Sequence, residues 1–195
     1  MICKFKYNTR MTKALFLILL TFTTMISAAE EDINIPFTPD SAKYWQFISD
    51  RVMGGVSDGQ LALEQDGKMF FARLTGNVST KNNGGFIQLR SRISLANSEK
   101  DGKKLKGVRL NVRGNGETYY IFIRTNETRS PSDYYSASFE ANSYWQMIDL
   151  PFSKFERKWS NNSILDAKNI NSFGIVAYGR DFISDVSVST INFYY

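Results

Sequence analysis

From Tyr44 to the end of the chain, apolar and polar residues alternate in short runs. In residues 107–113, for example, Val108, Leu110 and Val112 are separated by polar residues. Successive side chains of a strand point to opposite faces, so this run predicts a strand with one buried and one solvated face. The same pattern occurs in residues 44–48, 60–64, 69–74, 85–92, 118–125, 134–140, 144–150, 172–178 and 186–194.

Residues that favour turns separate these runs. Asp66-Gly67 predicts a hairpin between two of them, because glycine accepts the positive φ that a tight turn needs. The sequence has no amphipathic helical pattern, and only single turns are expected near residues 151–155 and 165–168. About nine or ten strands with short connections predict an all-β fold, an antiparallel β-sandwich of the jelly-roll type.

The first 29 residues have a different pattern. Basic residues without any acidic ones precede an apolar run that starts at Ala14, and the small residues Ser27 and Ala29 follow. This order predicts a signal peptide over residues 1–29, cleaved before Glu30. The apolar run is shorter than the roughly 20 residues that a transmembrane helix needs, so we expect an exported, periplasmic or secreted protein without a membrane span.

The rest of the chain is predicted to form one domain. Residues 30–43 contain Pro36 and Pro39 and are predicted to be an irregular lead-in. Residues 44–195 show neither an internal repeat nor a second compositional block, and their number suits one sandwich. We therefore predict a single jelly-roll domain over residues 44–195.

Composition changes once the predicted signal peptide is set aside. The full chain has 24 Lys and Arg, 19 Asp and Glu, one Cys and no His, with a net charge of +5. Four basic residues and Cys3 leave with the signal peptide, so the charge becomes (24 − 4) − 19 = +1. This excludes sequence-independent nucleic-acid binding, Ser-His-Asp or Cys-His catalysis, and zinc sites built from Cys or His. No cofactor or metal site is predicted.

Two glycine-rich stretches depart from ordinary strand sequence. In residues 45–57, Gly54 and Gly55 suggest a close backbone approach, and Asp50 and Ser57 are able to tie the loop by hydrogen bonds to the backbone. A structured turn and a ligand site both remain open for this stretch. In residues 73–90, a second glycine pair opens a strand.

On that second strand, Gln88, Arg90 and Arg92 share one face, since they are two residues apart. The face is either a solvated surface or the floor of a binding groove. Arg113 and Arg124, in neighbouring predicted strands, suggest a cationic patch, which carboxylates could offset, or a ladder of alternating surface charge. The candidate carboxylates are Asp50, Asp133 and Asp149.

Aromatic residues gather in the middle of the chain. The adjacent Tyr134 and Tyr135 must place one ring on each side of a sheet, so one of them meets solvent or a ligand. The predicted site consists of Asp50, Gln88, Arg90, Arg124 and Tyr135, with Gly54, Gly55, Ser57, Gly84 and Gly85 shaping the backbone around it.

These stretches, Asp50 to Ser57 and Gly76 to Arg90, together with Tyr120 to Thr125, Trp145 and Pro151 to Phe155, resemble the complex I intermediate-associated protein 30 family. The resemblance extends from about Trp45 to Phe193. It implies a galactose-binding-like jelly roll. It also implies a non-catalytic role, since mitochondrial relatives act as assembly factors for respiratory complex I. The leader, in contrast, resembles a bacterial export signal and not a mitochondrial transit peptide.

Three hypotheses follow. The chain is an exported binding module that recognises a carbohydrate or a protein, or it is an assembly or chaperone-like factor that docks on a protein partner. The alternative is a carboxylate-based glycoside-active enzyme, in which Asp50 and either Asp133 or Glu140 would have to lie roughly 5 Å or 6.5–9.5 Å apart.

Overall fold

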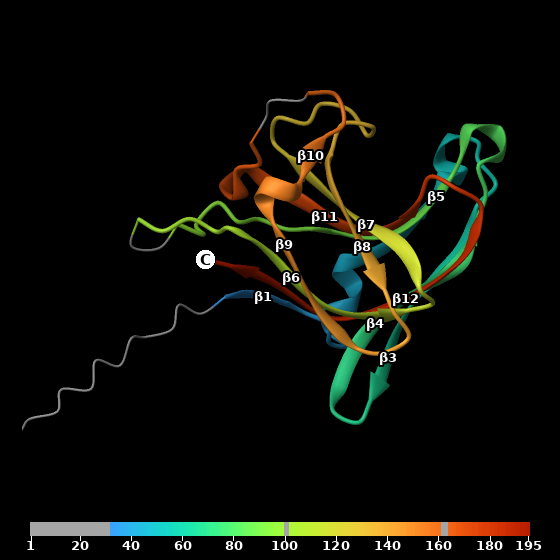
Figure 1. Ribbon diagram of the computed structural model, residues 1–195, viewed down its shortest axis with the longest axis horizontal. Helices are drawn as coiled ribbons and strands as arrows, with labels where there is room; N and C mark the ends of the chain where they lie inside the picture. Colours follow the sequence, from blue (N-terminus) through green and yellow to red (C-terminus); the bar gives the residue numbers. More distant parts are fainter. Residues whose placement is uncertain (1–31, 100–101, 161–163) are drawn as a thin grey trace, which may run out of the picture.

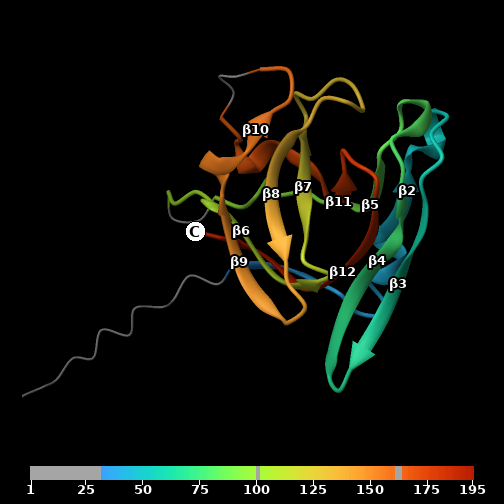
Figure 2. The same ribbon diagram turned by 45° about the vertical axis from the view of Figure 1, so that its right-hand side comes forward.

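The computed structural model describes residues 32–99, 102–160 and 164–195, so the predicted signal peptide lies outside the described residues. In the described part, twelve strands form two antiparallel sheets of six strands each. Figures 1 and 2 show the sheets as two layers that lie against each other. The predicted all-β antiparallel sandwich is therefore confirmed.

Sheet A has the strand order β3-β4-β12-β6-β9, and β1 pairs with β12. Its strands are β1 (Ile33–Pro36), β3 (Asp58–Asp66), β4 (Met69–Val78), β6 (Gly107–Gly114), β9 (Gln146–Pro151) and β12 (Phe182–Tyr194).

Sheet B has the order β10-β8-β7-β11-β5-β2. Its strands are β2 (Trp45–Ser49), β5 (Phe86–Arg92), β7 (Glu117–Thr125), β8 (Tyr135–Ala141), β10 (Glu156–Arg157) and β11 (Ile170–Tyr178).

The short helical turns connect strands. They are η1 (Ala42–Tyr44), η2 (Asp50–Met53), η3 (Lys81–Asn83), η4 (Phe152–Lys154) and η5 (Ala167–Asn169). None of the helical segments in the described ranges is long and apolar enough to cross a membrane.

All ten predicted runs contain a strand, and the hairpin at Asp66-Gly67 joins β3 to β4, with Gly67 at φ +59°. Two strands were missed. The two-residue β10 is too short for periodicity to reveal it. The interpretation of residues 30–43 as irregular is wrong for β1. β4 pairs with residues 182–188 of β12. The same edge of β12 is left free beyond them, and β1 pairs with it at residues 190–193.

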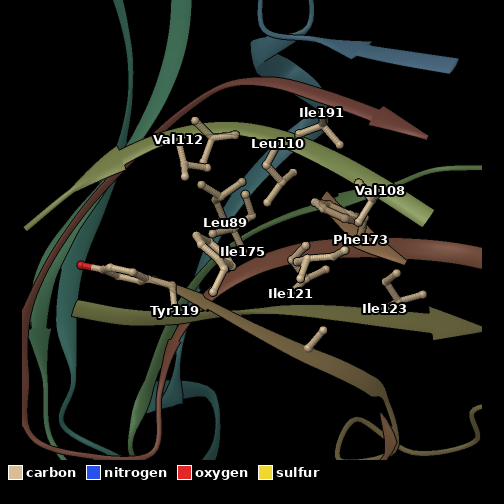
Figure 3. Close-up of a cluster of buried hydrophobic side chains, with 14 of the residues drawn as sticks. Leu89, Val108, Leu110, Val112, Tyr119, Ile121, Ile123, Phe173, Ile175 and Ile191 are labelled. Atoms are coloured by element: carbon tan, nitrogen blue, oxygen red, sulfur yellow. The ribbon is translucent and has the colours of Figure 1, made fainter. Parts of the chain in front are cut away.

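The core lies between the sheets. In Figure 3, Leu89, Ile121 and Ile175 of sheet B face Leu110 and Ile191 of sheet A. All five side chains have no exposed surface, and burying each stabilises the fold by about 1.5–3 kcal/mol. Because the core uses every second residue of β5, β7 and β11, the residues between them must point to the outer face of sheet B.

Arg113 corrects one prediction about charge. It lies in β6 of sheet A, whereas Arg90, Arg92 and Arg124 lie in sheet B. Strands 107–114 and 117–125 are consecutive in the chain but belong to different sheets, so Arg113 and Arg124 do not form one patch. Arg113 instead lies over the rings of Phe71 and Trp145, with its guanidinium carbon 5.0 and 4.8 Å from the ring centroids.

Candidate functional site

A single buried carboxylate joins the two glycine-rich loops. Asp50 is fully buried at the start of η2, and its Oδ1 accepts a hydrogen bond from the Ser57 N–H at 2.9 Å. Its Oδ2 accepts hydrogen bonds from the Ser57 hydroxyl at 2.5 Å, the Gly85 N–H at 2.6 Å and the Phe86 N–H at 3.2 Å. These four residues are called the Asp50 cluster below. The loops that the cluster joins lie side by side at one end of the molecule (Figures 1 and 2).

The glycines of both loops follow from this cluster. A Cβ atom on Gly55 would lie 2.3 Å from Asp50 Cγ, and one on Gly84 would lie 2.4 Å from Asp50 Oδ2. Gly54 and Gly85 have φ of +91° and +120°, which favour glycine. The predicted backbone-shaping role of Gly54, Gly55, Ser57, Gly84 and Gly85 therefore has a physical basis in the loops around Asp50.

Hydrogen bonding keeps Asp50 ionised. Burial alone raises its pKa, but the hydrogen bonds from Ser57, Gly85 and Phe86 outweigh burial, and the pKa lies below its ordinary value. The carboxylate is closed off from solvent and occupied by these donors. Asp50 therefore supports the loops and does not contact a ligand, which corrects its prediction as a binding residue.

The same geometry is incompatible with the glycoside-active alternative, which required Asp50 and either Asp133 or Glu140 to flank a glycosidic bond. Asp133 accepts two hydrogen bonds from Arg157, at 2.9 and 2.8 Å, and this pairing lowers its pKa. Asp50 is enclosed, so it cannot flank a glycosidic bond with Asp133 or Glu140. Among the described residues, no group of three or more His, Cys, Asp or Glu side chains is arranged to hold a metal ion.

A groove of about 520 Å³ crosses the outer face of sheet B. Val52 and Met53 of η2 form part of one wall, and both side chains are largely exposed, at 76% and 65%. The Asp50 cluster holds this wall in place. The floor comes from β5, β7 and β11 and consists of Phe86, Gln88, Arg90, Phe122, Arg124 and Tyr178.

Aromatic rings form one half of the floor. Phe122 and Tyr134 stack with centroids 3.8 Å apart and an interplanar angle of 15°. Tyr178 meets the Phe122 ring edge-on at 5.3 Å and Tyr120 at 5.8 Å. The stacked pair is almost fully buried, and the rings of Tyr120 and Tyr178 next to it are partly exposed.

Lys158 lies above this aromatic cluster. Its Nζ is 5.2 Å from the Tyr134 ring centroid and donates to the Tyr178 hydroxyl at 3.4 Å. Burial raises the pKa of Tyr134, whereas hydrogen bonding with Tyr134, and secondarily with Lys158, lowers the pKa of Tyr178. The cluster therefore has a polar rim of phenol and ammonium groups.

Polar side chains form the other half of the floor. Gln88 is 5% exposed and its Oε1 has no hydrogen-bond partner. The Nε of Arg124 is likewise buried without a partner, although its Nη2 donates to the Pro131 carbonyl at 2.6 Å. Arg90 Nε donates to the Ser172 hydroxyl at 2.7 Å. The structure thus brings together Gln88, Arg90 and Arg124, three of the five predicted site residues.

The prediction of Tyr135 as a binding residue is wrong, because its neighbour Tyr134 occupies the outer face of the sheet. Tyr135 is 1% exposed in the core between the sheets, with Arg157 over its ring at 5.6 Å, and Tyr134 lines the groove instead. The alternation of the sequence could have distinguished the two tyrosines. Tyr135 lies on the same face of the strand as the apolar Ala137 and Phe139, whereas Tyr134 lies on the same face as the polar Ser136.

Other groove residues were also missed, namely Val52, Met53, Phe86, Phe122, Lys158 and Tyr178. Phe122 shares the parity of Arg124 in β7, so period-two reasoning could have found it. Tyr178 and Lys158 could not be found in this way, because they come together only through the pairing of strands distant in sequence.

The groove continues in both directions across the strands. A hollow of about 460 Å³ towards β2 shares Arg90 and adds Lys43, Gln46 and Arg92. A hollow of about 860 Å³ towards β10 shares Tyr134, Lys158 and Tyr178. Through these shared lining residues, the groove and the two hollows form one track across sheet B.

Solved structures similar to this chain are carbohydrate-binding modules of Clostridium thermocellum. One is a family 11 module in complex with a β-1,3-1,4-mixed-linked tetrasaccharide, with a TM-score of 0.63, 15% identity, and coverage of 84% of this chain and 95% of that chain. Another is the family 11 module of a cellulosomal cellulase, with a TM-score of 0.64, 14% identity, and coverage of 87% and 97%.

A family 30 module of a cellulosomal cellulase from the same organism has a TM-score of 0.57 and 13% identity, and covers 83% of this chain and 96% of that chain. At these identities the likeness concerns the fold. No curated protein sequence matches the chain.

The sequence itself carries a family signature. The pattern of complex I intermediate-associated protein 30 matches residues 35–184, which is most of the chain and includes both glycine-rich loops and the groove floor. The chain therefore belongs to the complex I intermediate-associated protein 30 family.

Proposed function

We propose that this protein is a non-catalytic binding module that holds a saccharide chain in the groove across sheet B. The observation that carries the proposal is the floor itself, where the partly exposed ring of Tyr178 shares a groove with an unpaired buried acceptor and donor, Gln88 Oε1 and Arg124 Nε. A sugar presents apolar C–H faces and hydroxyl groups at the same time. Apolar faces suit the rings, and hydroxyl groups suit the polar atoms.

The length of the track favours a chain over a single sugar. The groove and the two hollows beside it are continuous through shared residues, namely Arg90 on one side and Tyr178 on the other. An oligosaccharide of several units would use the whole track. The similar fold of a family 11 module in complex with a tetrasaccharide supports this proposal.

Tyr178→Ala tests the proposal, because it removes a partly exposed ring while leaving the buried Phe122–Tyr134 stack in place. We expect it to weaken saccharide binding at least about tenfold, equivalent to about 1.4 kcal/mol. Affinity electrophoresis through gels that contain mixed-linkage β-glucan, xylan, galactan or polygalacturonate measures this. Tyr144→Ala is the matched control, because Tyr144 is 63% exposed and does not line the groove.

A protein partner in the same groove is the second candidate, as an assembly or chaperone-like factor. The exposed Val52 and Met53 favour it, since adjacent exposed apolar side chains are typical of protein contact sites. Crosslinking from a photoreactive residue at position 53 in the native envelope distinguishes a protein partner from a saccharide ligand. A discrete crosslinked protein band, with no retardation by any polysaccharide, would replace the saccharide proposal.

A further inference from the structure

The groove floor holds two guanidinium groups without an acidic partner. Arg90 of β5 and Arg124 of β7 lie on either side of β11, opposite Gly174 and Ser172. In the part of the chain that the structure describes, neither arginine forms an ion pair with a carboxylate. Burial lowers the pKa of both arginines, that of Arg124 to about 10. The charge of Arg92 adds to the lowering at Arg90, and the charge of Arg90 adds to it at Arg124. Arginine is protonated at neutral pH, so both groups stay charged.

Three other arginines are paired with carboxylates. On sheet A, Arg73 makes two hydrogen bonds of 2.8 Å to Asp185, and Arg109 makes bonds of 2.6 and 3.0 Å to Asp149. Arg157 is held in the same way by Asp133. Hydrogen bonding to the carboxylate raises the pKa of each of these three arginines. Arg90 and Arg124 differ from these three arginines, because in the described part of the chain they line a groove without a carboxylate partner.

Partly buried charges without a counter-ion are costly, and the cost is relieved when an anion arrives from outside. A carboxylate fits best, because a planar guanidinium binds its two oxygens with parallel hydrogen bonds. The charge of Asp133 raises the pKa of Arg124, but both oxygens of Asp133 accept hydrogen bonds from Arg157.

Two further features define what carries the carboxylate. Gln88 Oε1 is a buried acceptor and needs a donor, such as a hydroxyl group. Gly174 has no side chain between Arg90 and Phe122, and a Cβ there would lie 3.2 Å from Gln88 Oε1, so the backbone leaves this part of the floor open. A hexuronic acid unit supplies a carboxylate, hydroxyl donors and an apolar face on one ring.

We propose that the groove recognises an acidic saccharide, whose uronate carboxylate is bound by Arg90 and Arg124 while its hydroxyl groups reach Gln88. This inference rests on the proposed saccharide-binding function and names its ligand class. Arg92, Lys43 and Lys158 line the same track, so neighbouring uronate units of a chain also meet positive charge.

The test compares polygalacturonate, alginate and glucuronoxylan oligosaccharides with their carboxyl-reduced forms by isothermal titration calorimetry. We expect at least one acidic form to bind 10-fold or more tightly than its reduced form at 20 mM NaCl, and the difference to shrink at 500 mM NaCl because salt screens charge. Arg90→Gln and Arg124→Gln should abolish the difference while binding of the reduced form persists. Arg73→Gln, on sheet A, is the matched control and should change nothing.

The outcomes separate the two proposals. If reduced forms bind as tightly as acidic ones, or if the arginine variants retain the preference, the acidic-ligand inference is overturned and saccharide binding stands. If no saccharide binds, or only polyglutamate does, both are overturned. If either variant fails to fold, the salt dependence of the unaltered protein tests the acidic-ligand inference instead. A preference for the acidic form that does not shrink at 500 mM NaCl would overturn it.

Discussion

At the scale of single residues, Asp50 explains most of what is unusual in the sequence. Its two carboxylate oxygens accept four hydrogen bonds, and these join residues 50–57 to residues 79–86. The residue is structural, and it also shapes the groove, because Val52 and Met53 lie in the same short helical turn and form part of one wall.

Asp50→Asn tests this role. An amide presents N–H groups where the carboxylate accepted hydrogen bonds, so buried donors of Ser57 or Gly85 lose their partner, at about 1–3 kcal/mol for each. We expect the free energy of unfolding in urea to fall by roughly 3 kcal/mol. Asp58→Asn is the control: Asp58 is exposed and 3.5 Å from Arg51, and its loss should cost less than about 0.5 kcal/mol. Equal effects of the two changes would contradict the role.

The pKa of Asp50 also predicts how stability depends on pH. A native pKa below the ordinary value of about 3.9 means that the unfolded chain binds the proton more tightly. The carboxylate therefore stabilises the fold fully above about pH 5, and this contribution is lost as the pH falls below 4. Asp133 and Asp149 add to the same trend through their bonds to Arg157 and Arg109. Urea unfolding from pH 7 to pH 3 should show a smaller acid loss for Asp50→Asn than for the unaltered protein.

At the scale of elements, the two loops and β5 act as one unit. The Gly85 carbonyl accepts a hydrogen bond from the Gly179 N–H at 2.8 Å, and Asp181 accepts hydrogen bonds from the backbone and hydroxyl of Thr80, at 2.6 and 2.7 Å. The loop before β5 is thus fixed to η2 on one side and to the β11–β12 connection on the other. This double attachment keeps the end of the groove rigid.

Gly55→Ala and Gly54→Ala distinguish close packing from backbone conformation. Gly55 has no room for a Cβ next to Asp50, whereas Gly54 has open space but φ of +91°. We expect losses of roughly 3 kcal/mol for Gly55→Ala and roughly 1 kcal/mol for Gly54→Ala, measured by urea unfolding. The reverse order would show that the approach to Asp50 does not constrain the loop.

At the scale of the whole molecule, the outer faces of the sheets differ in electrostatics. Arg73 and Arg109 of sheet A form ion pairs, whereas Arg90 and Arg124 of sheet B form none in the described part of the chain. Arg113 of sheet A lies over aromatic rings instead. The proposed binding chemistry therefore belongs to sheet B, where the two unpaired arginines line a groove.

Export is a prediction for the whole chain. We propose that the basic and apolar leader directs secretion and is cleaved after Ala29, leaving a nearly neutral protein. Mass spectrometry of the protein from its own culture should find it in the envelope or medium, beginning at Glu30. An Ala29→Leu variant should remain unprocessed, because the small residue before the cleavage site is lost. Recovery of the intact chain from the cytoplasm would contradict export.

The sequence predicted the strands well because alternation is local. Each of the ten runs needed only its own residues, and the face occupied by Gln88 and Arg90 follows from the same parity. The same rule would have placed Phe122 and Tyr134 in the groove. It failed for β1, whose short, proline-containing sequence forms a strand only because the edge of β12 is available.

By itself, then, the sequence determined the fold class, the alternation of faces in ten of the twelve strands and the two glycine-rich loops, since periodicity and glycine conformation depend on neighbouring residues. Only the tertiary structure decided that both loops close on one carboxylate, that Arg113 and Arg124 belong to different sheets, and that Tyr178 and Lys158 meet beside Phe122. These outcomes depend on strand pairing between distant segments, and pairing is set by the packing of the whole core.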